Sequence, residues 1–338
     1  TQSTTPIYII DGFQSEDGLK NIDVNDIKTI DILKDASTTA IYGARGSNGV
    51  VLITTKSGSQ GTSSISYDFQ YSINSLARRP ELLNSQEYLT QMKEADPTFT
   101  DVNIRELISN GVWDGVSSTD WYDVAFNASP ASRHTVTFQG ANDKGSYFLS
   151  LNNLYDNGII REDRDTYKRL SVMLNADYKI KPWLKVGTTA NYANYTSKAI
   201  SDGSGGTSYV SMIATVMTLA PYIADTYPAD ALPTQMQAQI ANGFTLLQNA
   251  NGDYYSCLGT MEQVHPMVAI RMNDKKNTGN SLMGTLYANF TPIKDLVFTT
   301  RLGYRIATDN TYTHNNLYYG SASASNKDRN GVTRTSLS

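Results

Sequence analysis

Strict alternation of apolar and polar side chains is the feature that most limits how this chain can fold. In residues 65–74 one parity is Ile, Tyr, Phe, Tyr, Ile and the other is entirely polar. Successive side chains of a β-strand point to opposite faces, so this stretch predicts a strand with one apolar and one polar face. The pattern recurs, with Met173 as an exception, in residues 134–141, 147–155, 168–178, 184–192, 282–290 and 296–306. We therefore expect about seven strands, most of them near the ~9–11 residues that cross a bilayer when tilted.

The connections between these strands alternate between long and short. Residues 75–133, 156–167 and 196–281 are long, whereas NDKG, KIKP and TPIKD are short turns. This rhythm is typical of transmembrane β-barrels, which have short periplasmic turns and long extracellular loops. An open sheet would leave unsatisfied edges in lipid, so we expect further chain to complete the barrel. A plugged barrel of 22 strands, at roughly 40 residues per strand, needs about 880 residues, of which this internal piece would supply about a third.

Composition excludes several other classes of protein. Only 18% of residues are charged, the formal net charge is −4, and there are 22 tyrosines against 9 phenylalanines. No basic stripe appears, so we expect no nucleic-acid partner. Cys257 is the only cysteine and therefore forms no disulfide within the chain. His134, His265 and His314 lie far apart without metal-ligand spacing, so we expect no metal and no cofactor.

Residues 1–57 have a different, mixed α/β pattern. PIYIIDG predicts a short strand closed by a turn at Asp11-Gly12, and DIKTIDILK and GVVLITTK predict two more strands. Asp35 is suited to cap a helix over residues 36–44, followed by a glycine-rich turn. The GxxxxGK[ST] spacing of phosphate-binding loops is absent. Residues 58–64 form a polar, flexible linker to the first alternating strand.

The stretch from PIYIIDG to DILKDASTTAIYGARGSNGVVLITTKSG closely resembles the plug signature of the SusC/RagA family of TonB-dependent outer-membrane transporters. TDWYDVAF, residues 157–180 and residues 183–192 also resemble early barrel strands of that family. Siderophore receptors usually have Gly-Pro where this chain has Asp35-Ala36. The positions that carry the plug signature are Asp11, Gly12, Asp35, Ala36, Ser37, Tyr42, Gly43, Arg45, Gly46, Asn48 and Gly49.

The resemblance implies a transmembrane antiparallel β-barrel of about 22 strands with a small α/β plug. Residues 1–57 would be the C-terminal half of the plug, 58–64 the linker and 65–338 the N-terminal third of the barrel. Extracellular loops would span 76–133, 156–167, 196–281 and 307–338. The family implies the Gram-negative outer membrane, energy supplied by TonB through a segment outside this sequence, a SusD-like surface lipoprotein as lid, and oligosaccharide or peptide cargo. It implies no enzymatic activity.

Two groups of residues are candidates for function. Arg45 can pair with acidic residues of the barrel lumen and hold the plug, or it can be exposed in a loop. Aromatic side chains of the long loops can stack on sugar rings or contact the lid, or they can pack the loops against one another. These aromatic residues are Trp113, Trp121, Tyr209, Tyr222, Tyr227, Tyr254 and Tyr255. Residues 232–244 predict a short helix in the third outer loop.

Three alternatives remain open from the sequence. The first is a TonB-dependent receptor for an iron chelate or cobalamin, which a basic or histidine-rich binding site would favour. The second is a soluble surface glycan-binding β-protein, which predicts strands polar on both faces. The third is a glycosidase, which needs two carboxyl groups across a cleft. Glu162, Asp163 and Asp165 instead lie together in the charged segment REDRD, which is typical of a solvated hairpin.

Overall fold

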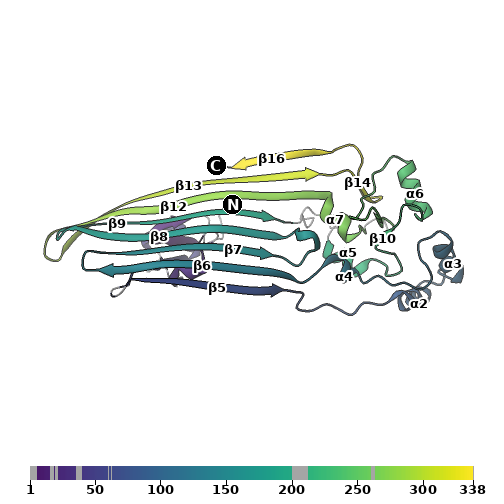
Figure 1. Ribbon diagram of the computed structural model, residues 1–338, viewed down its shortest axis with the longest axis horizontal. Coiled ribbons are helices and arrows are strands. Elements are labelled where there is room, and N and C mark those ends of the chain that lie inside the picture. Colours follow the sequence, from purple (N-terminus) through teal and green to yellow (C-terminus); the bar gives the residue numbers. More distant parts are fainter. Residues whose placement is uncertain are drawn as a thin grey trace.

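The structure is a computed structural model of the chain and describes residues 6–15, 19, 22–35, 40–59, 61, 63–199, 212–259 and 263–337. It consists of a small N-terminal unit, one large sheet of long strands, and outer loops gathered at one end of that sheet (Figure 1). The small unit, drawn in purple, lies behind the sheet in this view. No helix in the described ranges is long and apolar enough to cross a membrane.

The large sheet has eight antiparallel strands in the order β16-β13-β12-β9-β8-β7-β6-β5. Sequence neighbours pair directly wherever a short turn joins them, at residues 143–144, 182–183 and 294–295. The strands are β5 (Ser64–Asn74), β6 (Ser129–Asn142), β7 (Gly145–Asn157), β8 (Thr166–Lys181), β9 (Leu184–Lys198), β12 (Asn273–Ile293), β13 (Leu296–Asn315) and β16 (Gly331–Leu337). All seven expected strands are therefore present.

The eighth strand, β16, was not expected, and the loop predicted for residues 307–338 is wrong in this respect. The end of β13 and all of β16 lie within that range and pair from Asp309↔Leu337 to Asn315↔Gly331. Both faces of β16 carry polar side chains, so it lacks the apolar alternation that marks the other strands. The loop predicted for 196–281 is also shorter, because β9 continues to Lys198 and β12 begins at Asn273.

The alternation seen in the sequence becomes two chemically different faces. On β8, Leu170 and its even-numbered neighbours face away from the plug, and Leu170 is 48% exposed. Arg169, Ser171 and Met173 are buried on the opposite face. Met173, the exception in the sequence pattern, is 2% exposed and lines a small cavity together with the plug residues Ile10, Phe13 and Ile22. The apolar thioether of Met173 can face the inner side of the sheet because the plug covers this part of that face.

The plug unit is a four-stranded sheet in the order β2-β1-β4-β3. Its strands are β1 (Ile7–Ile10), β2 (Phe13–Ser15), β3 (Ile27–Leu33) and β4 (Val50–Thr55), with β1 parallel to β4 and β3 antiparallel to it. Asp11 adopts a φ of 48° in the β1–β2 turn, and its carboxylate accepts hydrogen bonds from the Thr55 amide at 2.9 Å and hydroxyl at 2.6 Å. These bonds tie the turn to the end of β4.

The helix expected over residues 36–44 appears in a different form. Residues 36–39 lie outside the described part of the chain, and η2 (Ala40–Asn48) is a 3-10 helix interrupted at Gly43, whose φ is 65°. A second short 3-10 helix, η1 (Val24–Asp26), precedes β3. Glycine suits position 43, because a side chain would disfavour this left-handed backbone conformation.

The outer loops form their own packed layer at the end of the sheet opposite the short turns (Figure 1). The described helix α6 confirms the helix expected within residues 232–244. Two small two-stranded sheets, β10–β11 and β14–β15, complete the layer. Its elements are α2 (Ser85–Ala95), α3 (Asp101–Ser109), α4 (Trp121–Ala125), η3 (Arg161–Asp163), α5 (Met212–Thr218), β10 (Thr226–Tyr227), α6 (Thr234–Ala241), β11 (Tyr254–Tyr255), α7 (Pro266–Met272), β14 (Tyr318–Ser321) and β15 (Ala324–Asn326).

Candidate functional site

The plug contacts the inner face of the sheet through η1, and we call this contact the plug–wall seam. Asp23 caps η1 by accepting a hydrogen bond from the Asn25 amide at 3.0 Å. The carbonyl of Asp26 accepts from the Lys56 amide at 2.9 Å, which fixes η1 to the end of β4. These local bonds hold the carboxylates of Asp23 and Asp26 in position against β6, β7 and β8.

Asp23 forms the ion pair at the centre of the seam. Its side chain is fully buried, and Arg169 Nη2 on β8 donates to its Oδ2 at 2.6 Å. Arg133 on β6 contributes a second, more distant guanidinium at 3.9 Å. An unpaired carboxylate would be strongly disfavoured in this position, so the two arginines determine where the plug can sit.

Asp26 joins a chain of polar groups on β6 and β7. Asn152 Nδ2 donates to Asp26 Oδ2 at 3.0 Å, and Thr135 Oγ1 donates to Asn152 Oδ1 at 2.6 Å. Asn25 Nδ2 lies 3.4 Å from Thr135 Oγ1. Burial, reinforced by the charge of Asp23, raises the pKa of Asp26 to about 6, although a hydrogen bond with Ser150 lowers it. Asp26 therefore takes up a proton in mildly acidic conditions.

A small apolar contact and a polar cavity complete the seam. Met283 packs in a cluster with the plug residues Ile10, Ile22, Val51 and Ile53. A cavity of about 550 Å³ lies between the plug and the wall, and Asp11, Asn175, Asp177, Tyr287 and Arg301 are among its lining residues. Polar lining of this kind is suited to water, so the plug fills the inner side of the sheet only in part.

Gly303 on β13 allows the plug hairpin to approach the wall closely. A Cβ atom at this position would lie 2.1 Å from the ring of Phe13 in β2. A Cβ at Gly12 would similarly lie 2.1 Å from the guanidinium of Arg301. The β1–β2 turn therefore rests directly on β13.

The plug-signature positions support the plug fold rather than contact the wall as a group. Tyr42 packs on the apolar cluster of Ile7, Ile9 and Val50. Gly49 has a φ of 94°, Gly46 is buried, and Asp35 and Asn48 are exposed. Arg45 lies in η2, with its side chain outside the described part of the structure, and Ala36 and Ser37 fall in the undescribed segment. The proposed pairing of Arg45 therefore stays a prediction.

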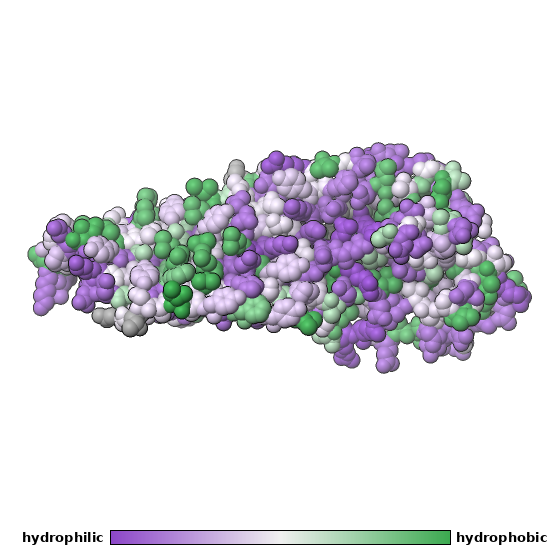
Figure 2. All heavy atoms as spheres, viewed as in Figure 1, coloured by the Kyte–Doolittle hydropathy of each residue, from purple (hydrophilic) through white to green (hydrophobic). Residues whose placement is uncertain are grey.

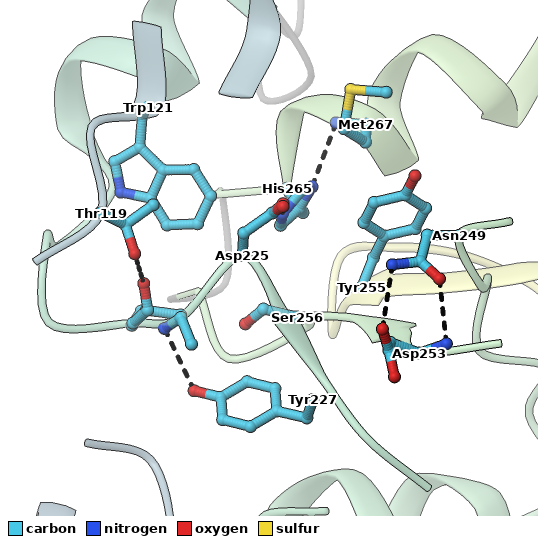
Figure 3. Close-up of polar contacts among 12 residues, drawn as sticks. Thr119, Trp121, Asp225, Tyr227, Asn249, Asp253, Tyr255, Ser256, His265 and Met267 are labelled. Carbon is cyan, nitrogen blue, oxygen red and sulfur yellow. Dashed lines mark hydrogen bonds and ion pairs between the residues drawn. The ribbon is translucent and has the colours of Figure 1, made fainter. Parts of the chain in front are cut away.

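The outer loops enclose a polar centre around His265, shown in Figure 3. His265 Nε2 lies 2.9 Å from Asp225 Oδ1, and the Met267 amide donates to His265 Nδ1 at 3.1 Å. These partners assign the proton to Nε2, because Nδ1 acts as an acceptor. Burial lowers the pKa of His265 despite the hydrogen bond and charge of Asp225, which act in the opposite direction.

Trp121 is the largest fully buried side chain of this layer and is 1% exposed. Its Nε1 donates to the Ala220 carbonyl at 3.2 Å, and its ring meets His265 edge-on at 5.1 Å between centroids. The surrounding apolar cluster draws residues from α4, α5 and α7. We call this cluster, together with His265 and Asp225, the loop core.

Most of the aromatic side chains considered as ligand or lid contacts pack the loops. Trp113 and Tyr255 are buried, Tyr222 and Tyr254 are half-buried, and Tyr209 lies outside the described residues. Tyr227 is buried, donates to the Val112 carbonyl at 2.7 Å and has its pKa raised by burial to about 12. This geometry favours the packing alternative for the described rings, and their contact with ligand or lid stays a prediction.

The carboxylates of the REDRD segment stabilise the loop. Glu162 accepts from Arg271 Nε at 2.9 Å, and Arg164 pairs with Asp274 at 3.2 Å. Asp165 accepts from the Ile160 amide at 3.2 Å. Across the described ranges, no group of three or more His, Cys, Asp or Glu side chains could hold a metal ion.

The residues of the seam were not found from the sequence. Asp23 and Arg169 are 146 positions apart, and Asp26 and Asn152 are 126 apart. A partial signal exists, since Arg133 and Arg169 occupy the polar parity of strands whose other parity is apolar. A charge on the inner face of a barrel strand requires a partner in the lumen.

A plug seated on the polar face of an antiparallel sheet whose other face is apolar defines the class of plugged outer-membrane β-barrels. A family model described as TonB-dependent Receptor Plug Domain matches residues 1–50. TonB-dependent receptor P26 of Formosa agariphila is 29% identical over 298 residues, covering 86% of this chain and 26% of that receptor. TonB-dependent receptor SusC of Bacteroides thetaiotaomicron is 28% identical over 336 residues, covering 94% of this chain and 32% of SusC.

A solved structure, that of the RagAB peptide transporter, shares the fold with a TM-score of 0.75 at 24% identity, covering 95% of this chain and 37% of that chain. Together these similarities support a SusC/RagA-like fragment of a TonB-dependent transporter. It spans 26% and 32% of the two curated relatives described above. These relatives are receptors and transporters rather than enzymes, and the outer-membrane location argues against the soluble alternative.

Proposed function

We propose that the complete protein imports oligomeric nutrients across the outer membrane by TonB-dependent displacement of the plug. The observation that carries this proposal is the polar seam, in which Asp23 is held by Arg169 and Asp26 by Asn152. Charged groups regain hydration when they separate in a water-filled lumen, so such a contact holds the plug specifically and still allows its release. TonB supplies the pulling force.

The cargo that we propose is an oligosaccharide, delivered by a SusD-like lipoprotein that covers the outer loops. Peptides are the alternative, which the similarity of the fold to the RagAB peptide transporter supports. A receptor for an iron chelate or cobalamin is the remaining rival. The outer loops are packed around a common apolar core, and a pre-assembled layer of this kind suits docking of a lid.

A disulfide across the seam tests the proposal. The side chains of Asn25 and Thr135 approach within 3.4 Å, and the single native cysteine, Cys257, is buried. In cells carrying the complete transporter, the pair N25C and T135C should stop growth on the imported nutrient and recover it with a reductant. Each single variant is the matched control, and mass spectrometry verifies the bond.

The same cells identify the cargo class when supplied with defined oligosaccharides, peptides, iron chelates or cobalamin as the limiting nutrient. Loss of growth on oligosaccharides alone supports the proposed cargo. Uninterrupted uptake through a transporter whose disulfide is fully formed would contradict release of the plug at this seam.

A further inference from the structure

The membrane-facing side of the sheet carries a shallow groove near the short turns. The groove has a volume of about 550 Å³ and crosses β8, β9, β12 and β13. Small side chains form its floor, because Ala176 pairs with Thr188, and Ala288 pairs with Thr300. Larger side chains flank the floor, including Leu286, 49% exposed, and Leu302, 65% exposed. Figure 2 shows apolar residues concentrated on this half of the visible strand surface.

The groove lies at the depth of one lipid leaflet. Ala176 is five residues from Lys181, and Ala288 is five residues from Ile293, at the ends of their strands. A rise of about 3.3 Å per residue places the floor roughly 15 Å from the turns. The hydrocarbon core of one leaflet is also roughly 15 Å thick. An acyl chain anchored at the turns would therefore reach the groove.

The turns beside the groove are basic. Lys144, Lys179, Lys181 and Lys294 lie in or next to them, against the aspartates Asp143 and Asp295, which leaves an excess of two positive charges. All four lysines are exposed, and none forms an ion pair with another described residue. Basic side chains next to a membrane surface attract anionic lipid headgroups.

An aromatic anchor joins the two turns that face the groove. The Thr291 amide donates to the Trp183 carbonyl at 2.8 Å, and the Trp183 ring meets Phe290 edge-on at 5.4 Å. Trp183 remains 46% exposed. Tryptophan with one exposed edge is enriched at the headgroup level of membranes, which places these turns at the lipid–water interface.

We propose that the groove seats an acyl chain of an anionic phospholipid from the periplasmic leaflet, with its phosphate headgroup at Lys181 and Lys294. Small side chains let the chain approach the backbone closely, and the lysines select a headgroup with net negative charge. A second copy of this chain is a poorer occupant, because a two-fold contact would bring like-charged turns together. A zwitterionic lipid could fill the groove without matching the charge of the turns.

Native mass spectrometry of the complete transporter in mild detergent tests this assignment with phosphatidylglycerol and phosphatidylcholine of identical acyl chains. The parent protein should retain phosphatidylglycerol at least about fivefold better. K181Q combined with K294Q should reduce this preference to less than about twofold. A288L should lower the binding of both lipids because it fills the floor of the groove.

Two matched variants provide the controls. K168Q removes an exposed lysine at the opposite end of β8, and A190L enlarges an outward-facing residue outside the groove. Both should bind lipid as the parent does, and all variants should keep the migration shift on heating that folded barrels show in gels. Equal retention of the two lipids by the parent, or equal effects of the control and groove variants, would overturn the proposal. Loss of preference in the lysine variant without any effect of A288L would overturn the groove as the seat.

Discussion

The plug–wall seam and the loop core bury their side chains by different chemistry. The seam buries charges, with Asp23 fully enclosed against Arg169, and leaves a polar cavity of about 550 Å³ beside the plug. The loop core buries apolar and aromatic side chains, and Trp121 and Val216 are almost fully enclosed. The seam and the loop core should therefore respond differently when the parts that form them are pulled apart.

Separation of the loop core would expose apolar surface to water, which is unfavourable by about 25 cal/mol per Å². Separation of the seam mainly returns charged groups to water, and their regained hydration offsets the lost ion pair. The seam is nevertheless sensitive to the loss of one member of the ion pair, because the other charge would then be buried without a partner. The difference indicates that the plug is held specifically but released at low cost, while the loops remain assembled.

The largest expected effect is on the loop core. W121A removes a buried ring that three helices surround, and should destabilise the loops by about 4 kcal/mol. Limited proteolysis of the complete transporter should show cleavage in the outer loops. W183A removes an exposed tryptophan at the opposite end of the sheet and serves as the control. Equal protease resistance of W121A and W183A would show that the Trp121 ring does not hold the loop core together.

R169M should weaken the seam by about 3 kcal/mol, because it leaves the buried carboxylate of Asp23 without its close partner. A cysteine reporter at Ser150, buried on the wall beside Asp26, should then react with a thiol reagent roughly 100-fold faster. R133M should have a smaller effect, since Arg133 is 3.9 Å from Asp23. Adding D23N to R169M should restore part of the protection, and its failure to do so would exclude the ion pair as the cause.

G303A should displace the plug hairpin, because its methyl group would overlap the ring of Phe13. Overpacking of this kind destabilises by about 2 kcal/mol. The Ser150 cysteine reporter should become more reactive, and F13L should reverse the change. G331A, where an added Cβ meets nothing within 4 Å, should leave the reporter unchanged. Unchanged reactivity of the Ser150 cysteine reporter in G303A would show that β2 does not rest on β13.

Acidification should strengthen the seam. Burial raises the pKa of Asp26 from 3.8 to about 6, so the docked plug binds a proton more readily than the released plug. This stabilisation of the docked plug is present below about pH 4 and is lost as the pH rises towards 6. The free energy of docking should change by about 1–2 kcal/mol over this interval. Comparison with D26N at each pH cancels the pH dependence of the thiol reporter. A parallel profile in D26N would assign the effect to another group.

Acidification should weaken the loop core. Burial lowers the pKa of His265 below its usual 6.5, so stability is complete above that pH and falls as pH decreases. Protonation would also remove the acceptor of the Met267 amide. The protease sensitivity of the loops should rise between pH 7 and pH 5 in the parent, and should rise less in H265Q. Opposite pH responses would confirm that the seam and the loop core are held by different chemistry, and identical responses would contradict it.

The strands could be predicted where one face meets lipid, because apolar side chains must then alternate, as in residues 168–178. β16 escaped prediction because both of its faces are polar. The short turns and the helix at residues 234–241 followed from local signals.

The seam could not be predicted because its plug–wall pairs connect residues more than 100 positions apart. Each partner alone resembles an ordinary polar residue, and only the three-dimensional position of the plug joins them. Met173 was visible as an anomaly in the alternation, but its cause, burial beside plug residues, required the structure.

We expect the seam to open while the loop core stays closed. Single cysteines at Ser150, which is fully buried at the seam, and at Val216, fully buried in the loop core, report on the two regions in the complete transporter with Cys257 replaced by serine. A thiol reagent should modify the seam reporter at least about tenfold faster than the loop-core reporter. Equal rates, or faster modification at Val216, would contradict it.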